Sequence, residues 1–568
     1  MTKEAIGLTG AQIQLSDADP VLLAEGMQLI REEKAMSFRE AMRHHWRGCL
    51  WSITLSLALV MDGYDGSIVN SFYALPAFLE RFGENYTDSA GVTTKQISAN
   101  YQTAISNIGL PGNLLALFVV GYCQDRFGSR RTYIAGMGLT ICVVFLFVFL
   151  QSIKMLLAAN ALGAFCWGLF NTLTAAYAAE ICPIKLRGLA ASFISMAWGF
   201  GGFLSSGMAR AALSIDGDWS WRMPYVLQFV WPVPLFIVAW FAPESPYWLV
   251  RKGRLEDAKD SLKRTASKGY YDTRSLDGYI AYIKHTDDLE RAEASTGSVW
   301  EMFKGTNLRR TEIMMGLWAM QVWSGTGMTA YATQFFKNAG MSTVAAFNLS
   351  MVVTGMNIVG CFIEFFLIAR WGRRPLILLG MLSLAVCLLL IGALGCVPHS
   401  NPTLQAIGAF MVMINLLYHA SVGPLTYTVA SELPASRLRA RAIAFGRAFY
   451  SCNYAVQSQL TPRMVSVTGW NWSAKSGFFF LGLNLLITVW AYFRMPETGG
   501  FSFAELELLF ANKVPARKFT KVEIHDEAVA GNTKFDEADE EEGHGYPGEK
   551  AAEQQVEDIV SPTPTQLK

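Results

Sequence analysis

The sequence predicts an all-α membrane protein in which twelve transmembrane helices form two pseudo-symmetric six-helix halves. Of its 568 residues, 52% are hydrophobic and 16% are charged. Apolar stretches of about 20 residues, the length that a helix needs to cross a bilayer, recur along the chain. Three short polar motifs also occur once in each half of the chain, at matching places. Such internal repeats are typical of secondary transporters.

Hydropathy windows divide the chain into spans and polar segments. The twelve expected spans, numbered in order, are 48–72, 101–123, 132–150, 155–181, 188–210, 222–242, 311–336, 345–369, 375–396, 404–430, 440–466 and 474–494. The expected domains are a cytoplasmic N-terminal segment (1–46), a first half (47–242), a central loop with short helices (243–310), a second half (311–496) and an acidic, largely disordered cytoplasmic tail (497–568). Alternating charges at helical spacing predict the short helices.

The repeated motifs lie at equivalent helix ends of the two halves. They are DRFGSR (125–130) and ARWGRR (369–374), EICPIKLRG (180–188) and ELPASRLRA (432–440), and PES (243–245) and PET (496–498). The two copies of each motif are separated by about 250 residues, which indicates a duplicated unit. The sequence therefore predicts a substrate site between two halves that rock around it.

Composition excludes several classes of function. The net charge of +1 gives no electrostatic argument for a nucleic-acid partner. The nine cysteines lie almost wholly within spans or at their edges, and no metal or redox spacing is present. Because the chain also lacks a phosphate-cradling loop and a catalytic triad order, we expect no cofactor, no metal and no enzymatic activity.

Loop charge predicts the orientation. Basic residues gather in the loops after spans 2, 4, 8 and 10, whereas the loop 211–221 has no lysine or arginine between its ends. The positive-inside rule then places both termini in the cytoplasm. Asn85 begins an N-glycosylation sequon in the longest outside loop, where it is either glycosylated or a chance tripeptide.

Acids at helix ends recur together with the loop arginines. Such pairs can hold the cytoplasmic face closed and must break when the halves rock. The alternative is that the basic residues only fix the topology. The predicted cytoplasmic gate consists of Asp125, Arg126, Arg130, Glu180, Arg187, Arg370, Arg374, Glu432 and Arg439.

Two carboxylates interrupt span 1. Asp62 and Asp65 are three residues apart, so they lie on one side of a helix. Acids within a membrane span usually face a wet cavity and mark an ion or substrate path. We therefore predict that the pair carries a proton. The alternative is that one of them caps a helix broken around Gly63 and Gly66.

Span 11 contains the matching cation. Arg447 lies several residues inside the predicted cytoplasmic end, where it can pair with an aspartate and be released when that aspartate is protonated. The alternative is a structural arginine that extends to the membrane surface.

Polar and aromatic side chains in the second half favour a sugar as the second cargo, because amides and hydroxyls bind sugar hydroxyls while aromatic faces pack on the ring. Some of these side chains can instead join helices. The predicted substrate-binding residues are Gln321, Ser324, Thr326, Tyr331, Asn357, Tyr427 and Asn453.

The doubled motifs, closed by PES and PET, resemble the sugar-porter branch of the major facilitator superfamily over residues 45–520. Within that range MDGYD (61–65), PESPYWLVRKGR (243–254) and VPARKF (514–519) are similar to the fungal maltose and general α-glucoside permeases. The resemblance implies proton-coupled α-glucoside uptake across the plasma membrane. It also implies that Asp62 and Asp65 form an acidic coupling pair, that Arg447 is the span-11 arginine, and that Gln321 contacts sugar.

Four positions depart from the family pattern. Asn113 stands where many relatives have an acid, and Gly202, Val322 and Gly327 replace sugar-contacting amides. We therefore expect a monomeric, bilayer-embedded symporter of a proton and a glucoside, such as maltose, lactose or cellobiose. The alternative is a transporter-like sugar sensor that signals without net transport.

Overall fold

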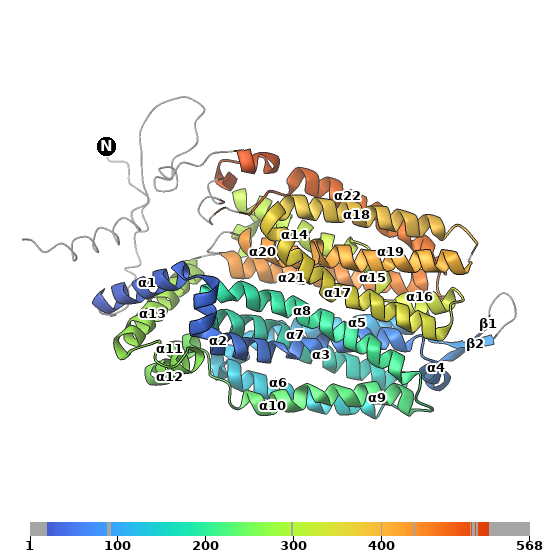
Figure 1. The fold of residues 1–568 in the computed structure, drawn as a ribbon, viewed down its shortest axis with the longest axis horizontal. Coiled ribbons are helices and arrows are strands. Elements are labelled where there is room, and N and C mark those ends of the chain that lie inside the picture. Colours follow the sequence, from blue (N-terminus) through green and yellow to red (C-terminus); the bar gives the residue numbers. More distant parts are fainter. Residues whose placement is uncertain are drawn as a thin grey trace, which may run out of the picture.

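The computed structural model describes residues 20–87, 93–296, 299–398, 400–434, 438–499, 501, 506 and 509–521. These residues form a long helical bundle with one two-stranded sheet (Figure 1). The first half of the chain forms one layer of the bundle and the second half forms the other.

The twelve expected membrane-crossing segments are confirmed, several of them as broken helices. Those of the first half are α2 (Phe38–Ser56) with α3 (Ala58–Phe72), α5 (Ala99–Phe127), α6 (Ser129–Val148), α7 (Ile153–Ile181), α8 (Ile184–Ala212), and α9 (Trp219–Leu227) with η1 (Gln228–Val230) and α10 (Pro232–Ala239). Those of the second half are α14 (Gly305–Trp323) with α15 (Thr326–Thr329) and α16 (Ala332–Asn338), α17 (Thr343–Trp371), α18 (Arg373–Leu394), α19 (Asn401–His419) with α20 (Val422–Glu432), α21 (Arg439–Val465), and η4 (Ser473–Lys475) with α22 (Ser476–Arg494).

The two halves pack their helices in the same order. In the first half α3 packs on α8, α5 on α7, and α6 on α10. In the second half α14 packs on α21, α17 on α19, and α18 on α22. The halves meet where α8 contacts α17 and where α5 contacts α21. This arrangement is the two-fold pseudo-symmetry that the repeated motifs predict.

Span 1 and span 7, which are equivalent in the two halves, are both interrupted. Span 1 breaks between α2 and α3 at Leu57. Span 7 breaks at Gly325, whose φ of +102° is strained for any residue with a side chain. A Cβ there would also lie 2.7 Å from a methyl carbon of Leu388. Broken helices near the middle of a membrane expose main-chain groups to a central site.

Eight helical segments of the described chain are long and apolar enough to cross a membrane by composition alone. The other four crossing segments are spans 1, 5, 7 and 11. Spans 1 and 7 are broken, and span 11 carries polar and charged side chains. Polar residues at membrane depth face protein or a cavity rather than lipid, and these four spans carry most of the residues discussed below.

One end of the bundle, here called the linker end, carries α1 (Pro20–Ala35) and three helices of the central loop: α11 (Pro246–Arg251), α12 (Leu255–Thr265) and α13 (Thr273–Thr296) (Figure 1). We expected short helices on the surface, and they have a core of their own. Ile30 of α1 is buried with residues of α11, α12 and α13, among them Trp248, Leu262 and Ile283.

The opposite end, here called the hairpin end, carries α4 (Pro76–Phe82) and an antiparallel pair of strands, β1 (Glu84–Thr87) and β2 (Thr93–Gln96) (Figure 1). Asn85 of the sequon is exposed on β1, opposite Lys95. Its glycosylation stays a prediction.

Part of the C-terminal segment packs on the second half at the linker end. η5 (Ala516–Lys521) and the residues just before it contact the start of α14. Arg309 Nη1 donates to the Val514 carbonyl at 2.8 Å, and its guanidinium lies over the rings of Phe510 and Phe519. The acidic stretch of the tail lies outside the described residues.

Candidate functional site

Both acids of span 1 face α7. Trp167 Nε1 donates to Asp65 Oδ2 at 3.0 Å, and Asn171 Nδ2 donates to Asp62 Oδ2 at 3.1 Å. Trp167 and Asn171 are four residues apart, so one face of α7 supplies a donor to each carboxylate. The two acids therefore share a surface, as their spacing predicts.

The two carboxylates differ in their remaining partners. Asp65 is 5% exposed and accepts a second bond at 2.9 Å from Gln228 Nε2, in the break between α9 and α10. Asp62 instead accepts a bond at 2.8 Å from Trp198 Nε1 of α8, the helix that packs on the second half. Asp65 is thus enclosed within the first half, whereas Asp62 lies toward the boundary between the halves.

Arg447 of α21 lies among aromatic rings. Its guanidinium carbon is 5.1 Å from the ring centroids of Trp318 and Tyr450 and 5.6 Å from that of Tyr427. Arg447 Nη1 also donates to the Tyr427 hydroxyl at 3.0 Å. Cation–π contacts in a desolvated site are worth about 2 kcal/mol or more. The three rings therefore stabilise the guanidinium charge within the bundle.

Arg447 and the aspartates are joined indirectly. In the described part of the chain no ion pair connects Arg447 with Asp62 or Asp65. A path of contacts connects them instead: Trp198 bonds Asp62, its ring lies 6.4 Å from that of Tyr427, and Tyr427 accepts the bond from Arg447. This path crosses the boundary between the two halves.

Three predicted sugar ligands lie at the break in span 7. Gln321 is buried, and its Nε2 donates to the Gly423 carbonyl at 3.0 Å. Ser324 Oγ donates to the Gln321 carbonyl at 3.1 Å and lies 3.3 Å from the Thr326 hydroxyl. Gln321 thus joins α14 to α20, as the alternative interpretation holds, whereas the Ser324 and Thr326 bonds stay within span 7. Gln321 Oε1 is buried with no hydrogen-bond partner among the described residues.

The other predicted ligands are more widely spread. Asn453 Oδ1 accepts a bond from Trp323 Nε1 at 3.0 Å. Asn357 faces α8, since a Cβ on Gly199 would lie 3.4 Å from its Cβ, and its Oδ1 is one of several buried amide oxygens with no partner in the described chain. Such acceptors suit the hydroxyl donors of a sugar.

The amides expected by the family pattern at 322 and 327 have a structural substitute. Gln457 of α21 donates from Nε2 to the Val322 carbonyl at 2.6 Å. A Cβ on Gly327 would lie 2.4 Å from that same nitrogen. The Gln457 side chain therefore fills the space beside Gly327.

The linker end of the first half has a network centred on Arg251 of α11. Its guanidinium nitrogens lie 3.5 Å from Asp125, 3.6 Å from Glu180 and 3.3 Å from Asp287 of α13. Two predicted gate acids thus meet one arginine that the motif comparison did not select. This network ties the central loop to the first half.

The glutamates of PES and PET cap equivalent helices. Glu244 accepts from the Arg130 N–H at 3.1 Å, at the start of α6. Glu497 accepts from the N–H groups of Arg373 and Arg374 at 3.0 and 2.9 Å, at the start of α18. Carboxylates at helix N-termini satisfy main-chain donors and complement the helix dipole. Burial raises the pKa of the Glu244 carboxyl, and the main-chain bonds oppose this shift.

A glycine precedes each cap. Gly128 has a φ of +90° and Gly372 a φ of +80°. A Cβ at Gly128 would lie 2.5 Å from a Glu244 carboxylate oxygen, and one at Gly372 would lie 2.9 Å from Glu497. The repeated glycine of DRFGSR and ARWGRR is thus required by the backbone and by the cap together.

In the second half, Glu432 and Arg374 are held at the linker end by residues of the same half and of the PET motif. Glu432 accepts from Arg373 Nη2 at 3.0 Å and from the Thr498 hydroxyl at 2.7 Å. Arg374 donates from Nε to the Met495 carbonyl at 2.9 Å and from Nη2 to that of Tyr492 at 2.7 Å.

The remaining predicted gate residues have other surroundings. Arg126 Nη1 donates to the Tyr122 hydroxyl at 3.1 Å, and Arg370 is exposed. The side chains of Arg187 and Arg439 lie outside the described residues.

Hydrogen bonds between the halves are concentrated at the hairpin end. Examples are Ser106 with the Tyr331 hydroxyl at 3.0 Å and Lys337 Nζ to the Ala74 carbonyl at 2.7 Å. Tyr331 also stacks on the ring of Tyr73. The other bonds join Tyr86 to Val467, Ala99 to Thr468, Arg210 to Asn348 and Ser458 to Asn107. Among the described residues, no hydrogen bond between the halves lies at the linker end.

Sequence reasoning missed the neutral residues around the acids. Trp167, Asn171, Trp198 and Gln228 are 102 to 163 positions away from the aspartates that they bond. Asn171 and Gln228 could have been selected because they are polar residues within apolar spans. Trp167 and Trp198 could not, because tryptophans are common in membrane helices.

Comparisons with known proteins identify the family of this chain. The family model described as "Sugar (and other) transporter" matches residues 51–510. The general alpha-glucoside permease of Saccharomyces cerevisiae is 34% identical over 89% of this chain and 82% of its own length. Maltose permease MAL31 of the same yeast is 33% identical over 90% of this chain and 84% of its own length.

Solved structures share the fold. The partially occluded inward open xylose transporter XylE from E. coli has a TM-score of 0.64 and 20% identity, covering 79% of this chain and 98% of that one. XylE bound to 6-bromo-6-deoxy-D-glucose has a TM-score of 0.62 and 22% identity, covering 81% and 98%. With its family-model match and its yeast relatives, the chain belongs to the sugar transporter family, and it has the fold of the solved xylose transporters.

Proposed function

We propose that this protein takes up a glucoside together with a proton across the plasma membrane by alternating access. The observation that carries the proposal is the contact path from Asp62 through Trp198 and Tyr427 to Arg447. Bonds to a charged acceptor contribute about 1.5–3 kcal/mol each, more than bonds to a neutral one. Protonation of Asp62 therefore weakens its bond to Trp198 and changes the contact between the halves.

Asp65 supports the same role from within the first half. Its two donors, Trp167 and Gln228, are neutral, so no fixed cation opposes its protonation. Because Trp167 and Asn171 lie on one face of α7, a change at either carboxylate is transmitted to the other through a shared helix.

The relatives and the polar inventory support a glucoside as cargo. The similar yeast proteins are named as α-glucoside and maltose permeases. Buried amide oxygens of Gln321 and Asn357, together with the nearby aromatic rings, suit a hydroxylated ring. We propose a disaccharide of the maltose, lactose or cellobiose type.

The contacts between the halves support alternating access. We propose that the linker end is cytoplasmic, because it carries the arginine-rich loops. The hairpin end is then outside, and the bonds there hold the outer side closed. Outward opening would then have to break the Ser106–Tyr331 and Lys337–Ala74 contacts.

Uptake of labelled mono- and disaccharides into yeast lacking its own sugar transporters, with external pH recorded, tests the proposal. We expect a disaccharide to enter and the medium to become alkaline as it does. Asp62→Asn and Asp65→Asn should each abolish the sugar-dependent alkalinisation, whereas the exposed Asp216→Asn should not. Surface abundance of each variant is measured in the same cells.

Unchanged proton uptake in both variants would reject the coupling role of the acids. Saturable binding of a disaccharide with no entry would instead identify a sugar sensor. The departures from the family pattern at Asn113, Gly202, Val322 and Gly327 favour the sensor. Gln457 supplies an amide beside Val322 and Gly327.

A further inference from the structure

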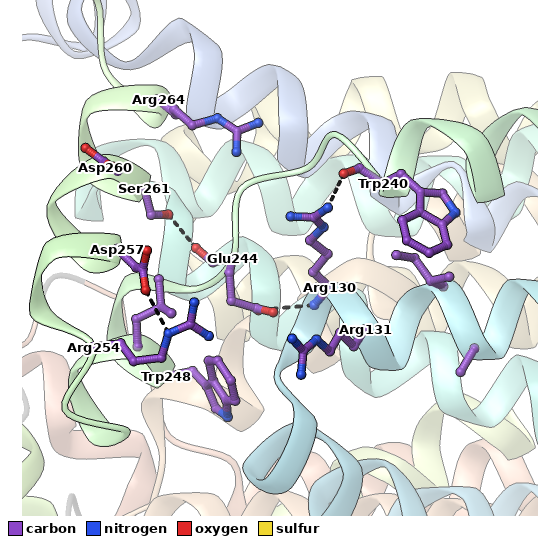
Figure 2. A pocket seen from close by; sticks show the side chains of 13 residues that line it. Arg130, Arg131, Trp240, Glu244, Trp248, Arg254, Asp257, Asp260, Ser261 and Arg264 are labelled. Atoms are coloured by element: carbon purple, nitrogen blue, oxygen red, sulfur yellow. Dashed lines mark hydrogen bonds and ion pairs between the residues drawn. The ribbon is translucent and has the colours of Figure 1, made fainter.

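A cavity of about 710 Å³ lies at the linker end of the first half, away from the path between Asp62 and Arg447 (Figure 2). The start of α6, the end of α10, and helices α11 and α12 surround it. Its volume is that of a typical small-molecule site. Its charged lining residues are Arg130, Arg131, Arg254 and Arg264, with Glu244, Asp257 and Asp260.

Two arginines from different helices donate hydrogen bonds to consecutive main-chain carbonyls. Arg130 Nη2 of α6 donates to the Trp240 carbonyl, and Arg264 Nη2 of α12 donates to the Phe241 carbonyl. Each guanidinium has five N–H donors in a planar fork. The main-chain bonds orient both forks at the rim of the cavity. In Figure 2 the exposed Arg131 lies near Glu244, below Arg130 and away from Arg264.

Two of the three carboxylates are engaged by other groups. Glu244 accepts from the N–H groups of Arg130 and Ser245, both at 3.1 Å. Asp257 accepts from Arg254 Nε at 2.7 Å. Asp260 lies on the side of α12 that is turned away from Arg130 in Figure 2. The part of the cavity between α6 and Arg264 is therefore predominantly cationic, which suits a phosphate.

An apolar surface of a membrane helix leads directly to this cationic rim. Val233, Ile237, Trp240 and Phe241 of α10 and the residues after it are exposed and spaced along one face, with Trp240 53% and Phe241 65% exposed. Tryptophans at the ends of membrane spans lie at headgroup level. A ligand that fits both surfaces has a phosphate and acyl chains.

We propose that this cavity binds the phosphorylated headgroup of an anionic phospholipid from the leaflet at the linker end. Arg130, Arg131 and Arg264 contact the phosphate, and the acyl chains lie along α10. Because the arginines belong to α6 and α12, the bound lipid fixes the central-loop helices to the first half. Nothing in this proposal depends on the transported substrate.

Purified full-length protein in neutral detergent provides the test. Binding is followed by titration and by thermal unfolding, with three probes: phosphatidylinositol 4-phosphate, phosphatidylcholine, and soluble inositol 1,4-bisphosphate as the headgroup without chains. We expect saturable binding and a raised melting temperature with the phosphoinositide only. Added salt should weaken the binding, because the attraction is electrostatic.

Substitutions assign the site. Arg131→Gln and Arg264→Gln should each weaken phosphoinositide binding about fivefold, and the double variant about 25-fold. Lys263→Gln is the matched control, since Lys263 is exposed on the same helix and does not line the cavity, and its affinity should not change.

Three results would overturn the proposal. Equal stabilisation by inositol 1,4-bisphosphate would assign the cavity to a soluble phosphate compound. Equal stabilisation by phosphatidylcholine would remove any role for the headgroup charge. Unchanged phosphoinositide affinity in Arg131→Gln, which makes no described contact with other elements, would move the site elsewhere even if Arg264→Gln failed to fold.

Discussion

The two halves share one scaffold but hold opposite charges within their membrane spans. The first half carries Asp62 and Asp65, bonded by tryptophan, asparagine and glutamine. The second half carries Arg447 in a cage of aromatic rings. Neither charge pairs directly with the other in the described chain. The proposed coupling to a proton therefore depends on an asymmetric placement of charge in two halves that share one scaffold.

The linker ends of the halves differ in the same way. Both begin their third helix with a positive-φ glycine and a glutamate cap. In the first half a separate helical bundle and an open cavity lie beside that cap, whereas in the second half Arg517 stacks on Tyr492 and Phe493 and the tail covers the region. The same glycine and glutamate cap is thus present in two different surroundings.

Among the tests of this comparison, the largest effect is expected from removing the cation of the second half. Arg447→Gln should reduce proton-coupled sugar uptake about 5- to 150-fold, the range of a typical coupling free energy. The reason is that Tyr427 then loses its charged partner while Asp62 keeps both of its donors. Uptake at matched surface abundance measures the effect.

Arg447→Lys separates charge from geometry. Lysine keeps the charge but lacks the planar guanidinium that stacks on rings, so we expect partial activity. Full activity in Arg447→Gln would show that the second half needs no cation and would remove the contrast between the halves.

A second test compares one amide from each half. Gln321→Ala should raise the apparent KM for sugar about tenfold, because a buried acceptor worth about 1–3 kcal/mol is lost. Asn171→Ala should instead alter the pH dependence of uptake, because Asn171 bonds Asp62. Sugar uptake measured over pH 5–8 distinguishes the two. An unchanged KM in Gln321→Ala would remove it from the sugar site.

The caps provide a test of stability. Glu497 accepts main-chain bonds from Arg373, Arg374 and Gly499. Glu244 also accepts main-chain bonds, from Arg130 and Ser245, but burial opposes its charged form and raises its pKa. Glu497→Gln should therefore lower stability by more than Glu244→Gln, within about 1.5–3 kcal/mol for charged bonds. Thermal unfolding of both variants checks the order, and the reverse order would contradict it.

The smallest effect concerns the bundle that only the first half carries. His45 is buried against Tyr270 and Tyr271, with its Nε2 3.7 Å from the Glu33 carboxylate and with His44 adjacent. Burial, with a smaller contribution from His44, lowers the pKa of His45 from 6.5 to about 4. The unfolded chain then binds the proton more readily, so stability falls as the pH drops from 6.5 towards 4.

Acidification from pH 7 to 5.5 should destabilise the protein by about 1 kcal/mol through this histidine. His45→Gln should flatten the pH dependence of the melting temperature, and His44→Gln should retain it. A melting temperature that rises on acidification would mean that protonated His45 pairs with Glu33 in the folded protein.

The sequence alone determined the twelve spans, the duplicated halves and the acids of span 1. Bilayer thickness fixes the length of an apolar helix, and a charge in such a helix stands out against its neighbours. The glycine and glutamate of each cap also repeat visibly, because the backbone at Gly128 and Gly372 accepts no other residue without strain.

Only the tertiary structure decided which groups meet. Trp198 bonds Asp62 from 136 positions away. Arg251 of the central loop lies near both Asp125 of α5 and Glu180 of α7. The sequence predicted an aspartate partner for Arg447, and the fold surrounds it with Tyr427, Trp318 and Tyr450 instead. Hydrophobic periodicity records which face of a helix is polar, but the partner of that face depends on how helices distant in the chain pack together.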